Sequence, residues 1–195
     1  MKKIIITVVV VFTTIVSFAQ TQPSEHLTFK GVPIDGTLNE YVSKMKQSGF
    51  TLIGTEDGVA MLKGDFAAYK DCIVGVATLK QKDLVSKITV IFPERNTWSM
   101  LSSNYFSLKE MLTEKYGEPS EVVETFDTYS EPKDDGGKMH AVEFDNCKYY
   151  SIFETEKGSI ELSISHNSVM SCYVILAYFD KINGDIIKAK AIDDL

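Results

Sequence analysis

The sequence contains one arginine, three histidines, three cysteines and one tryptophan among 195 residues. Acidic residues outnumber basic ones by 27 to 20, and the formal net charge is −7. Nucleic acids and anionic membrane surfaces are bound by clustered cations, so this composition argues against both as partners. With 5 prolines, 12 glycines and 44% hydrophobic residues, the chain is not collagen-like, coiled-coil or disordered, and we expect an ordinary globular protein.

The histidines, His26, His140 and His166, occur in none of the short spacings that bind zinc, such as HxxxH or HxxEH. We therefore expect ordinary surface histidines, no metal site and no cofactor. The sequence also has no GxSxG, GxGxxG or P-loop motif. A catalytic site would have to be assembled from dispersed residues, so we predict a protein that is not an enzyme and keep the dispersed site as the weakest alternative.

The three cysteines, Cys72, Cys147 and Cys172, are an odd number, so at least one thiol is left unpaired. Cys147 and Cys172 fall in the same predicted sheet and are the most plausible disulfide pair. Three buried thiols that act as small apolar side chains are an equally good interpretation. No basic group is placed beside any of them by the sequence, which disfavours a Cys/His nucleophile.

The long apolar run of the sequence lies at its start and has the layout of an export signal. The lysines of MKK precede an almost wholly apolar stretch, residues 4–18, and SFA supplies the small residues that signal peptidase needs before Gln20. A stretch of about 15 residues is short for a membrane-spanning helix, so cleavage is favoured over a permanent anchor. Removing residues 1–19 takes away two lysines and no acid, so the formal charge becomes −9. We expect a periplasmic or extracellular protein with no membrane span after cleavage.

Residues 31–96 predict a helix followed by four strands. Thr37 and Glu40 fit a capping box, apolar residues follow at helical spacing as far as Met45, and Gly49 is a typical helix stop. The strand-type runs after this helix are 51–55, 59–62, 67–79 and 85–92.

Residues 97–180 begin the same order again. Trp98, Leu101, Tyr105, Leu108 and Leu112 are spaced by 3 or 4 residues, which predicts an amphipathic helix that ends at Gly117. The strands expected after it are 121–126, 139–144, 149–154, 159–165 and 172–179. Apolar and polar residues alternate in 159–165, so one sheet face is wet, whereas 172–179 is apolar on both faces and predicts a central strand.

The loop 130–138 of this second half is acidic and contains Gly136 and Gly137. It lacks the closely spaced oxygen ligands of a calcium-binding loop. We predict a solvated hairpin connection in which the two glycines take positive φ.

Two markers indicate that the halves are repeats. The helix-stop glycines, Gly49 and Gly117, are 68 residues apart, and the segments that end at Cys72 and Cys147 match at an offset of 75. The predicted fold is α+β: two tandem units, each a helix plus a four-stranded antiparallel sheet, forming an open sheet with helices on one side. The predicted division is 1–19 signal peptide, 20–30 N-terminal segment, 31–96 first α/β repeat, 97–180 second α/β repeat and 181–195 C-terminal tail with a weak helical pattern.

This order of elements resembles the β-lactamase inhibitor protein family over residues 31–179. The resemblance rests on repeat length and on the two glycine-ended helices, Thr37–Gly49 and Tyr105–Gly117. It implies modules that are mostly non-catalytic and bind other proteins. It gives no inhibitory loop residue by residue, and the cysteine spacing departs from one short-range disulfide per half. The segment Phe29–Thr37 is also similar to exported hypothetical proteins of Bacteroidetes, for which no activity is implied.

Tyr149 and Tyr150 are neighbours in a predicted strand, so they point to opposite faces of the sheet. The tyrosine on the less buried face is a candidate anchor for a partner, because aromatic residues dominate interface hot spots. An ordinary half-exposed tyrosine is the alternative. Our hypothesis is an exported, non-catalytic module that binds another protein or envelope component through an open sheet face. The narrower alternative is an inhibitor of a secreted hydrolase, namely a β-lactamase, lysozyme or protease.

Overall fold

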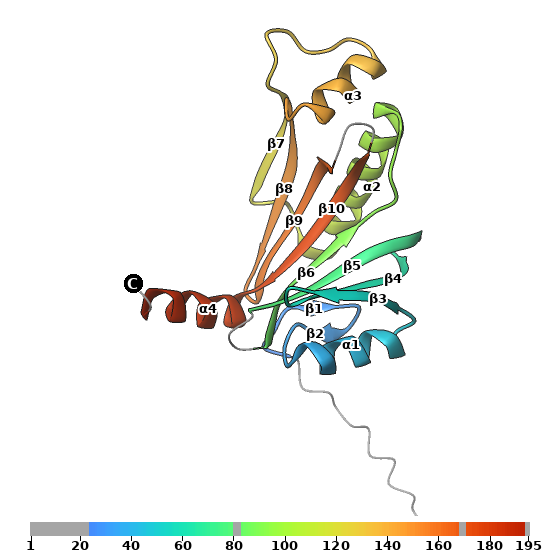
Figure 1. The fold of residues 1–195 in the computed structure, drawn as a ribbon. Coiled ribbons are helices and arrows are strands. Elements are labelled where there is room, and N and C mark those ends of the chain that lie inside the picture. The colour runs from blue at the N-terminus through green and yellow to red at the C-terminus, as the bar shows by residue number, and fades with distance from the viewer. Residues whose placement is uncertain (1–23, 80–82, 168–170, 194–195) are drawn as a thin grey trace, which may run out of the picture.

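The computed structural model describes residues 24–79, 83–167 and 171–193, so the predicted signal peptide lies outside the described residues. These residues form one large and one small antiparallel sheet with four helices, which confirms the α+β class (Figure 1). The elements of the first half are β1 (Thr28–Phe29), β2 (Val32–Pro33), α1 (Leu38–Gln47), β3 (Thr51–Glu56), β4 (Val59–Phe66), β5 (Tyr69–Leu79) and β6 (Leu84–Ile91). Those of the second half are α2 (Trp98–Tyr116), β7 (Glu121–Phe126), α3 (Asp135–Glu143), β8 (Cys147–Thr155), β9 (Gly158–His166), β10 (Cys172–Asp180) and α4 (Lys181–Asp193).

The large sheet has eight strands in the order β3-β4-β5-β6-β10-β9-β8-β7, with β1 and β2 forming the separate pair. All of its neighbouring strands are antiparallel. β10 pairs with β6 on one side and β9 on the other, so the prediction that 172–179 forms a central strand is confirmed. The four strands β3 to β6 follow α1 in the chain, and the four strands β7 to β10 follow α2.

The helix α1 forms where the local sequence signals predict it. The Thr37 side chain accepts a hydrogen bond from the Glu40 backbone N–H, and the Glu40 carboxylate accepts one from the Thr37 N–H, so the capping box is complete. This arrangement satisfies two backbone donors that the first helical turn leaves free. Tyr41, Val42 and Met45 form the buried stripe of the helix.

The helices α1, α2 and α3 cover one face of the large sheet. Contacts of α1 are with β3 to β6, whereas α2 contacts β8 to β10 and α3 contacts β8 and β9. The alternation expected in β9 is confirmed, because Ile160, Leu162 and Ile164 are buried on the helix side. Their cross-strand partners on β10 are Tyr178, Leu176 and Val174, which belong to the same core. The side chains between them point to the opposite face of the sheet.

The largest difference from the sequence prediction is α3. The loop 130–138 and the strand 139–144 were predicted here, but Asp135–Glu143 is a helix. The Asp134 side chain accepts a hydrogen bond from the Gly137 N–H and caps this helix, and both predicted positive-φ glycines are instead part of it. Met139 and Val142 are buried against the sheet, so tertiary burial outweighs the β propensity of the segment.

Because of this helix, the offset of 75 residues between the two cysteine segments does not support the predicted repeat. That offset places Cys72 of β5 on Cys147 of β8, which are the third strand of one group and the second strand of the other. The cysteine match therefore does not relate equivalent positions in the sheet. The cause is the segment 127–146, which carries α3 and has no counterpart between β3 and β4.

One tight turn strains the backbone, and another requires a close approach of two strands. The β4–β5 hairpin turns through Ala67 and Ala68 at φ 48° and 67°, the left-handed region that alanine rarely adopts. Gly158 begins β9 at φ 146°, and a Cβ atom added there would lie 2.0 Å from the Phe179 carbonyl oxygen. Only glycine fits at that point in the sheet.

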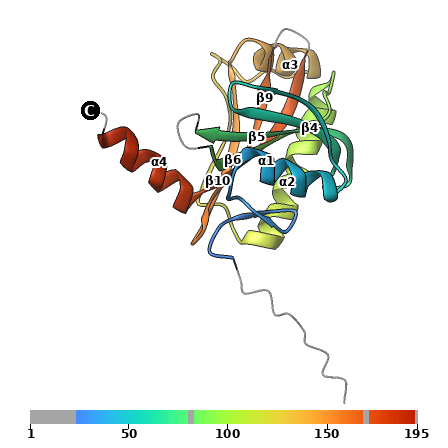
Figure 2. The same ribbon diagram turned by 60° about the horizontal axis from the view of Figure 1, so that its bottom comes forward.

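The C-terminal helix α4 projects from the rest of the molecule in both views (Figures 1 and 2). Asn183 is its buried residue, and most of its other side chains are exposed or half-buried. The predicted polar tail is thus helical from its first residue. In the described ranges, every helix is too short or too polar to cross a membrane.

Candidate functional site

The face of the large sheet opposite α1, α2 and α3 is the main candidate for a binding surface. The strand registers align one row of side chains across all eight strands of this open face. The row consists of Thr51, Lys63, Ile73, Ile91, Ile175, Ser163, Tyr150 and Val123. The three isoleucines are adjacent at its centre and half-buried. Lys63 and Ser163 flank them in the row, and an apolar centre with polar neighbours is the usual layout of a protein interface.

Tyr149 and Tyr150 lie on opposite faces, as predicted. The Tyr149 ring is on the helix side, where its centroid lies 5.0 Å from that of Trp98 and 5.5 Å from that of Phe126. Tyr150 is on the open face, and its hydroxyl donates to Glu121 Oε1 at 2.6 Å. This hydrogen bond raises the pKa of Tyr150. Of the two predicted binding residues, Tyr149 therefore belongs to the core and only Tyr150 is available to a partner on this face.

The open face also carries charged side chains of both signs. Lys87 lies over the Phe179 ring, with its Nζ 4.7 Å from the ring centroid. Glu161 stands beside Ile152 in the register of β8 and β9. The face thus offers aromatic, aliphatic and charged groups within one surface rather than a cluster of one sign.

The cysteines are free thiols, and the predicted Cys147–Cys172 disulfide is not formed. β9 lies between their strands. Neighbouring strands are about 4.8 Å apart, so the two Cα atoms are separated by roughly 10 Å, beyond the ~7 Å that a disulfide bridges. Burial raises the pKa of Cys147 to about 12 and that of Cys72 to about 11, so these thiols stay protonated at neutral pH. Cys72 and Cys172 are buried and Cys147 is half-buried, so the alternative of three buried thiols fits the first two.

The three histidines have different partners. His140 stacks on Phe144 of its own helix end, with centroids 4.3 Å apart, and His166 Nε2 lies 3.1 Å from Asp145 Oδ1. His26 is not an ordinary surface histidine, because its Nδ1 lies 3.0 Å from Asp180 Oδ1 and the Asp180 side chain is fully buried. Within the described ranges, His, Cys, Asp and Glu side chains form no group of three that could hold a metal ion.

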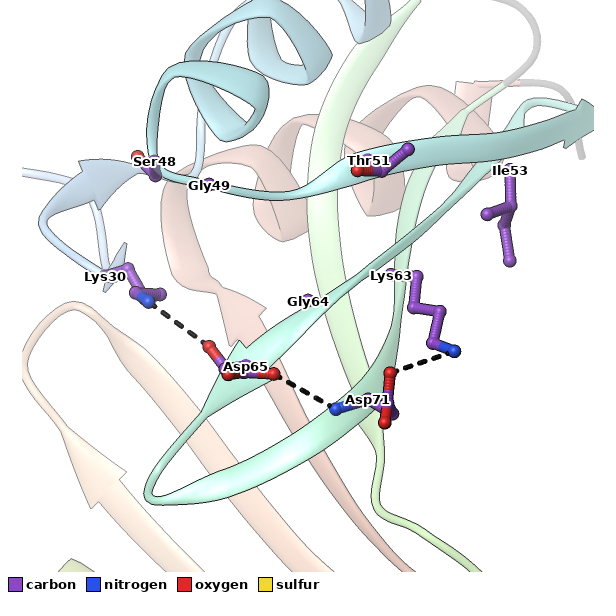
Figure 3. A pocket seen from close by; sticks show the side chains of 9 residues that line it. All are labelled: Lys30, Ser48, Gly49, Thr51, Ile53, Lys63, Gly64, Asp65 and Asp71. Carbon is purple, nitrogen blue, oxygen red and sulfur yellow. Dashed lines mark hydrogen bonds and ion pairs between the residues drawn. The ribbon is translucent and has the colours of Figure 1, made fainter.

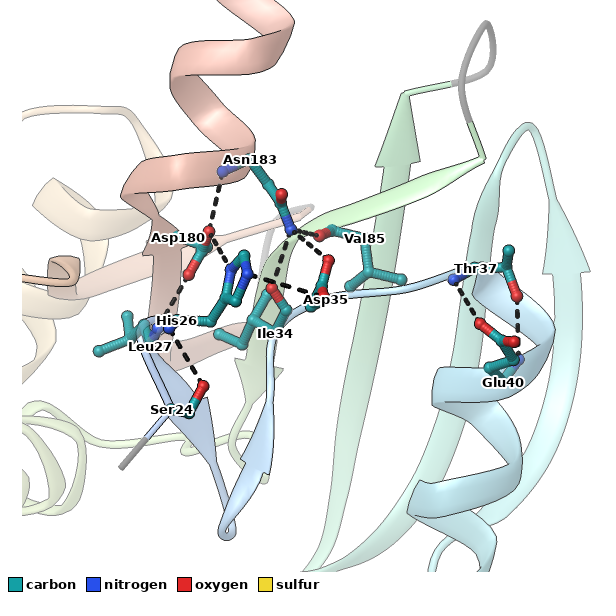
Figure 4. Close-up of polar contacts among 10 residues, drawn as sticks. All are labelled: Ser24, His26, Leu27, Ile34, Asp35, Thr37, Glu40, Val85, Asp180 and Asn183. Carbon is teal, nitrogen blue, oxygen red and sulfur yellow. Dashed lines mark hydrogen bonds and ion pairs between the residues drawn. The ribbon is translucent and has the colours of Figure 1, made fainter. Parts of the chain in front are cut away.

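Asp180, at the end of β10, is the centre of a buried polar cluster (Figure 4). Its carboxylate accepts hydrogen bonds from the Leu27 N–H at 2.8 Å and the Asn183 N–H at 2.9 Å, besides its contact with His26. A buried carboxylate is tolerated because donors surround it. The sequence signal that could have identified it is one acidic residue directly after the apolar run 172–179.

Asn183 extends the same cluster to the first half of the chain. Its Nδ2 lies within hydrogen-bond distance of the Val85 carbonyl at 2.8 Å, the Ile34 carbonyl at 3.0 Å and Asp35 Oδ1 at 3.3 Å. Burial acts to raise the pKa of Asp35, but hydrogen bonds from the Gly36 N–H and Asn183 outweigh it and lower the pKa overall. These groups hydrogen-bond to one another, so the cluster fastens the N-terminal segment to β6 and α4.

A surface hollow of about 570 Å³ lies beside the edge strand β3 (Figure 3). Its charged side chains already have partners within the chain. Lys63 Nζ lies 2.9 Å from Asp71 Oδ1, and Lys30 Nζ donates to the Asp65 backbone carbonyl at 3.3 Å. Because both lysines have partners, we assign no chemistry to this hollow.

Comparison of the chain with protein-family models, with curated proteins and with solved structures finds no match.

Proposed function

We propose that the protein is an exported, non-catalytic binding module that recognises another protein of the bacterial envelope or extracellular space. The open face of the large sheet is the proposed contact surface. The observation that carries the proposal is the alignment of Ile73, Ile91 and Ile175 with Tyr150 in one row on a face that α1, α2 and α3 leave uncovered.

The chemistry of this row supports a protein partner. Half-buried aliphatic side chains at the centre can be desolvated at little cost, whereas the lysines and glutamates around them favour one orientation of the partner. Tyr150 adds an amphipathic ring whose hydroxyl already has an acceptor in Glu121. A rigid tyrosine with a satisfied hydroxyl is a typical hot-spot residue.

The sheet order also supports the finer fold proposal of two tandem units, residues 31–96 and 97–180. The strand sequence β3-β4-β5-β6 on one side of the sheet centre mirrors β7-β8-β9-β10 on the other, and a helix precedes each set. In such an arrangement the two units contribute their inner strands, β6 and β10, to one continuous binding surface.

The test compares proteins captured from an envelope extract by the mature chain and by two variants. Ile175→Ser combined with Tyr150→Ala removes the centre of the row. Tyr129→Ala is the matched control, because Tyr129 is fully exposed in the loop after β7. We expect a partner that the wild type and the control retain and that binds the double variant at least roughly tenfold more weakly. Identical capture by all three folded proteins would overturn the proposal.

A further inference from the structure

The helix side of the sheet contains a smaller cavity of about 170 Å³ between α2 and the β4–β5 hairpin. Its lining is Phe66, Ala67, Leu108, Met111, Leu112, Lys115, Tyr116, Leu176 and Tyr178. Most of these side chains are apolar. An apolar cavity of about 150 Å³ is large enough to hold a benzene-sized molecule. The cavity therefore has the size and the lining for one small apolar group.

One end of this cavity is cationic. Lys115 Nζ lies 4.9 Å from the centroid of the Tyr116 ring, and the ion pairs formed among the described residues do not include Lys115. Met111, one turn earlier on α2, is 43% exposed, so the cavity reaches solvent along this helix. A ligand held in the chamber could place an anionic group beside the ammonium group at its mouth.

The inner end of the cavity carries a tyrosine. Tyr178 is buried, and burial together with the nearby Tyr116 and Tyr41 raises its pKa, so its hydroxyl remains neutral at physiological pH. Tyr178 therefore contributes a neutral side chain to the wall of the cavity.

The hairpin that forms one wall is strained. Ala67 lines the cavity, and it and Ala68 both have positive φ in a two-residue turn where asparagine and glycine are the favoured residues. Backbone strain of this kind concentrates where a protein positions a ligand. The small alanine side chain also leaves the chamber open beside Phe66.

We propose that this cavity binds a small amphipathic carboxylate, with a short acyl chain or a single aromatic ring in the chamber and the carboxylate paired with Lys115. The site is on the opposite side of the sheet from the proposed protein-binding face. It does not depend on that face, and the two proposals can fail separately.

The experiment titrates the wild-type protein with hexanoate and with its neutral analogue hexanol, followed by methyl and amide chemical shifts in NMR spectra. We expect hexanoate to bind with a Kd of about 1 mM, as suits so small a ligand, and to shift the signals of Ala67 and Leu108. Hexanol should bind roughly tenfold more weakly, because it cannot form the ion pair. Absence of shifts at these two residues would overturn the proposal.

Substitutions at two positions test the contributions of the apolar chamber and of the Lys115 charge separately. Leu108→Phe adds volume in the chamber and should abolish binding of both probes. Lys115→Met keeps the aliphatic stem and should weaken hexanoate binding to the level of hexanol, whereas Lys115→Arg should retain it within about threefold. Undiminished hexanoate binding by folded Leu108→Phe would refute the chamber, and equal binding by Lys115→Met and wild type would refute the carboxylate specificity.

Discussion

Removing the Asn183 amide is expected to destabilise the fold more than any other single change on α4. The amide nitrogen has two hydrogens for three acceptors, the Val85 and Ile34 carbonyls and the Asp35 carboxylate. Two full hydrogen bonds are therefore lost in Asn183→Ala, at about 1–1.5 kcal/mol each, and the carbonyls left without a donor raise the total to roughly 3 kcal/mol. For a protein of this size that loss lowers the Tm by roughly 6–12 °C.

Asn183→Asp tests the same role of the amide, because the side chain keeps its shape while the NH₂ donor is replaced by a carboxylate oxygen that accepts. The new carboxylate would lie buried among carbonyl oxygens and beside Asp35, so its folded-state pKa is raised above the unfolded value of about 3.9. The additional loss of stability is therefore absent below about pH 4 and appears as the pH rises through the folded pKa. We expect Asn183→Asp to be less stable than Asn183→Ala at pH 7 and to recover relative to wild type at pH 4.

Urea and thermal unfolding, followed by far-UV circular dichroism and by Trp98 fluorescence, measure these differences. Trp98 is 9% exposed in the second half of the chain, so coincident transitions of the two signals would show cooperative unfolding. Lys188→Ala, on the exposed side of α4, is the control and should change the free energy of unfolding by less than about 0.5 kcal/mol. If Asn183→Ala lost less than about 1 kcal/mol, or if Asn183→Asp showed the same deficit at pH 4 and pH 7, the proposed role of the amide would be wrong.

Three further predictions follow from the backbone and from helix capping. In Gly158→Ala the added methyl group would lie 2.0 Å from a backbone carbonyl oxygen, so the free energy of unfolding should fall by more than about 3 kcal/mol. In Gly184→Ala the methyl group meets open space in a helix, so the free energy of unfolding should rise by about 1 kcal/mol. Urea titrations compare the two variants. Replacing Ala67-Ala68 by Asn-Gly relieves two left-handed alanines, so the Tm should rise by several degrees in a calorimetric scan. The Asp135 carboxylate accepts hydrogen bonds from the Trp98 and Ser99 N–H groups at the start of α2, and the hydrogen bonds from Ser99 lower its pKa. Its contribution to stability is therefore present above the unfolded pKa near 4 and is lost as the pH falls through the lower folded pKa. Asp135→Asn should destabilise the protein at pH 7 and much less at pH 2.5.

The sequence predicted those elements whose signals are local. The capping box of α1 uses side chains three residues apart, and the alternation in β9 and the continuous apolar run of β10 reflect burial that each strand undergoes regardless of its exact partner. The α+β class followed from these periods. The opposite directions of Tyr149 and Tyr150 followed from strand geometry alone.

Positions that depend on distant partners could not be predicted in this way. The segment of α3 has weak helical amphipathicity and two glycines, and it is helical because Asp134 caps it and the sheet buries Met139 and Val142. For the same reason the sequence could not show which of the two tyrosines faces the core. His26 and Asp180 are 154 residues apart, and their contact has no signal in the sequence.

The amino-acid sequence by itself determined the periodicity of the strands, the start and end of α1, and the net acidic composition. The tertiary structure decided the rest: the sheet order that aligns three isoleucines with Tyr150, the cluster that fastens the N-terminal segment to α4, and the cavity beside the strained hairpin. The physical reason is that turn chemistry and hydrophobic period act over a few residues. Strand register, burial of a polar group and the shape of a cavity are set by residues that meet only when the whole chain is folded.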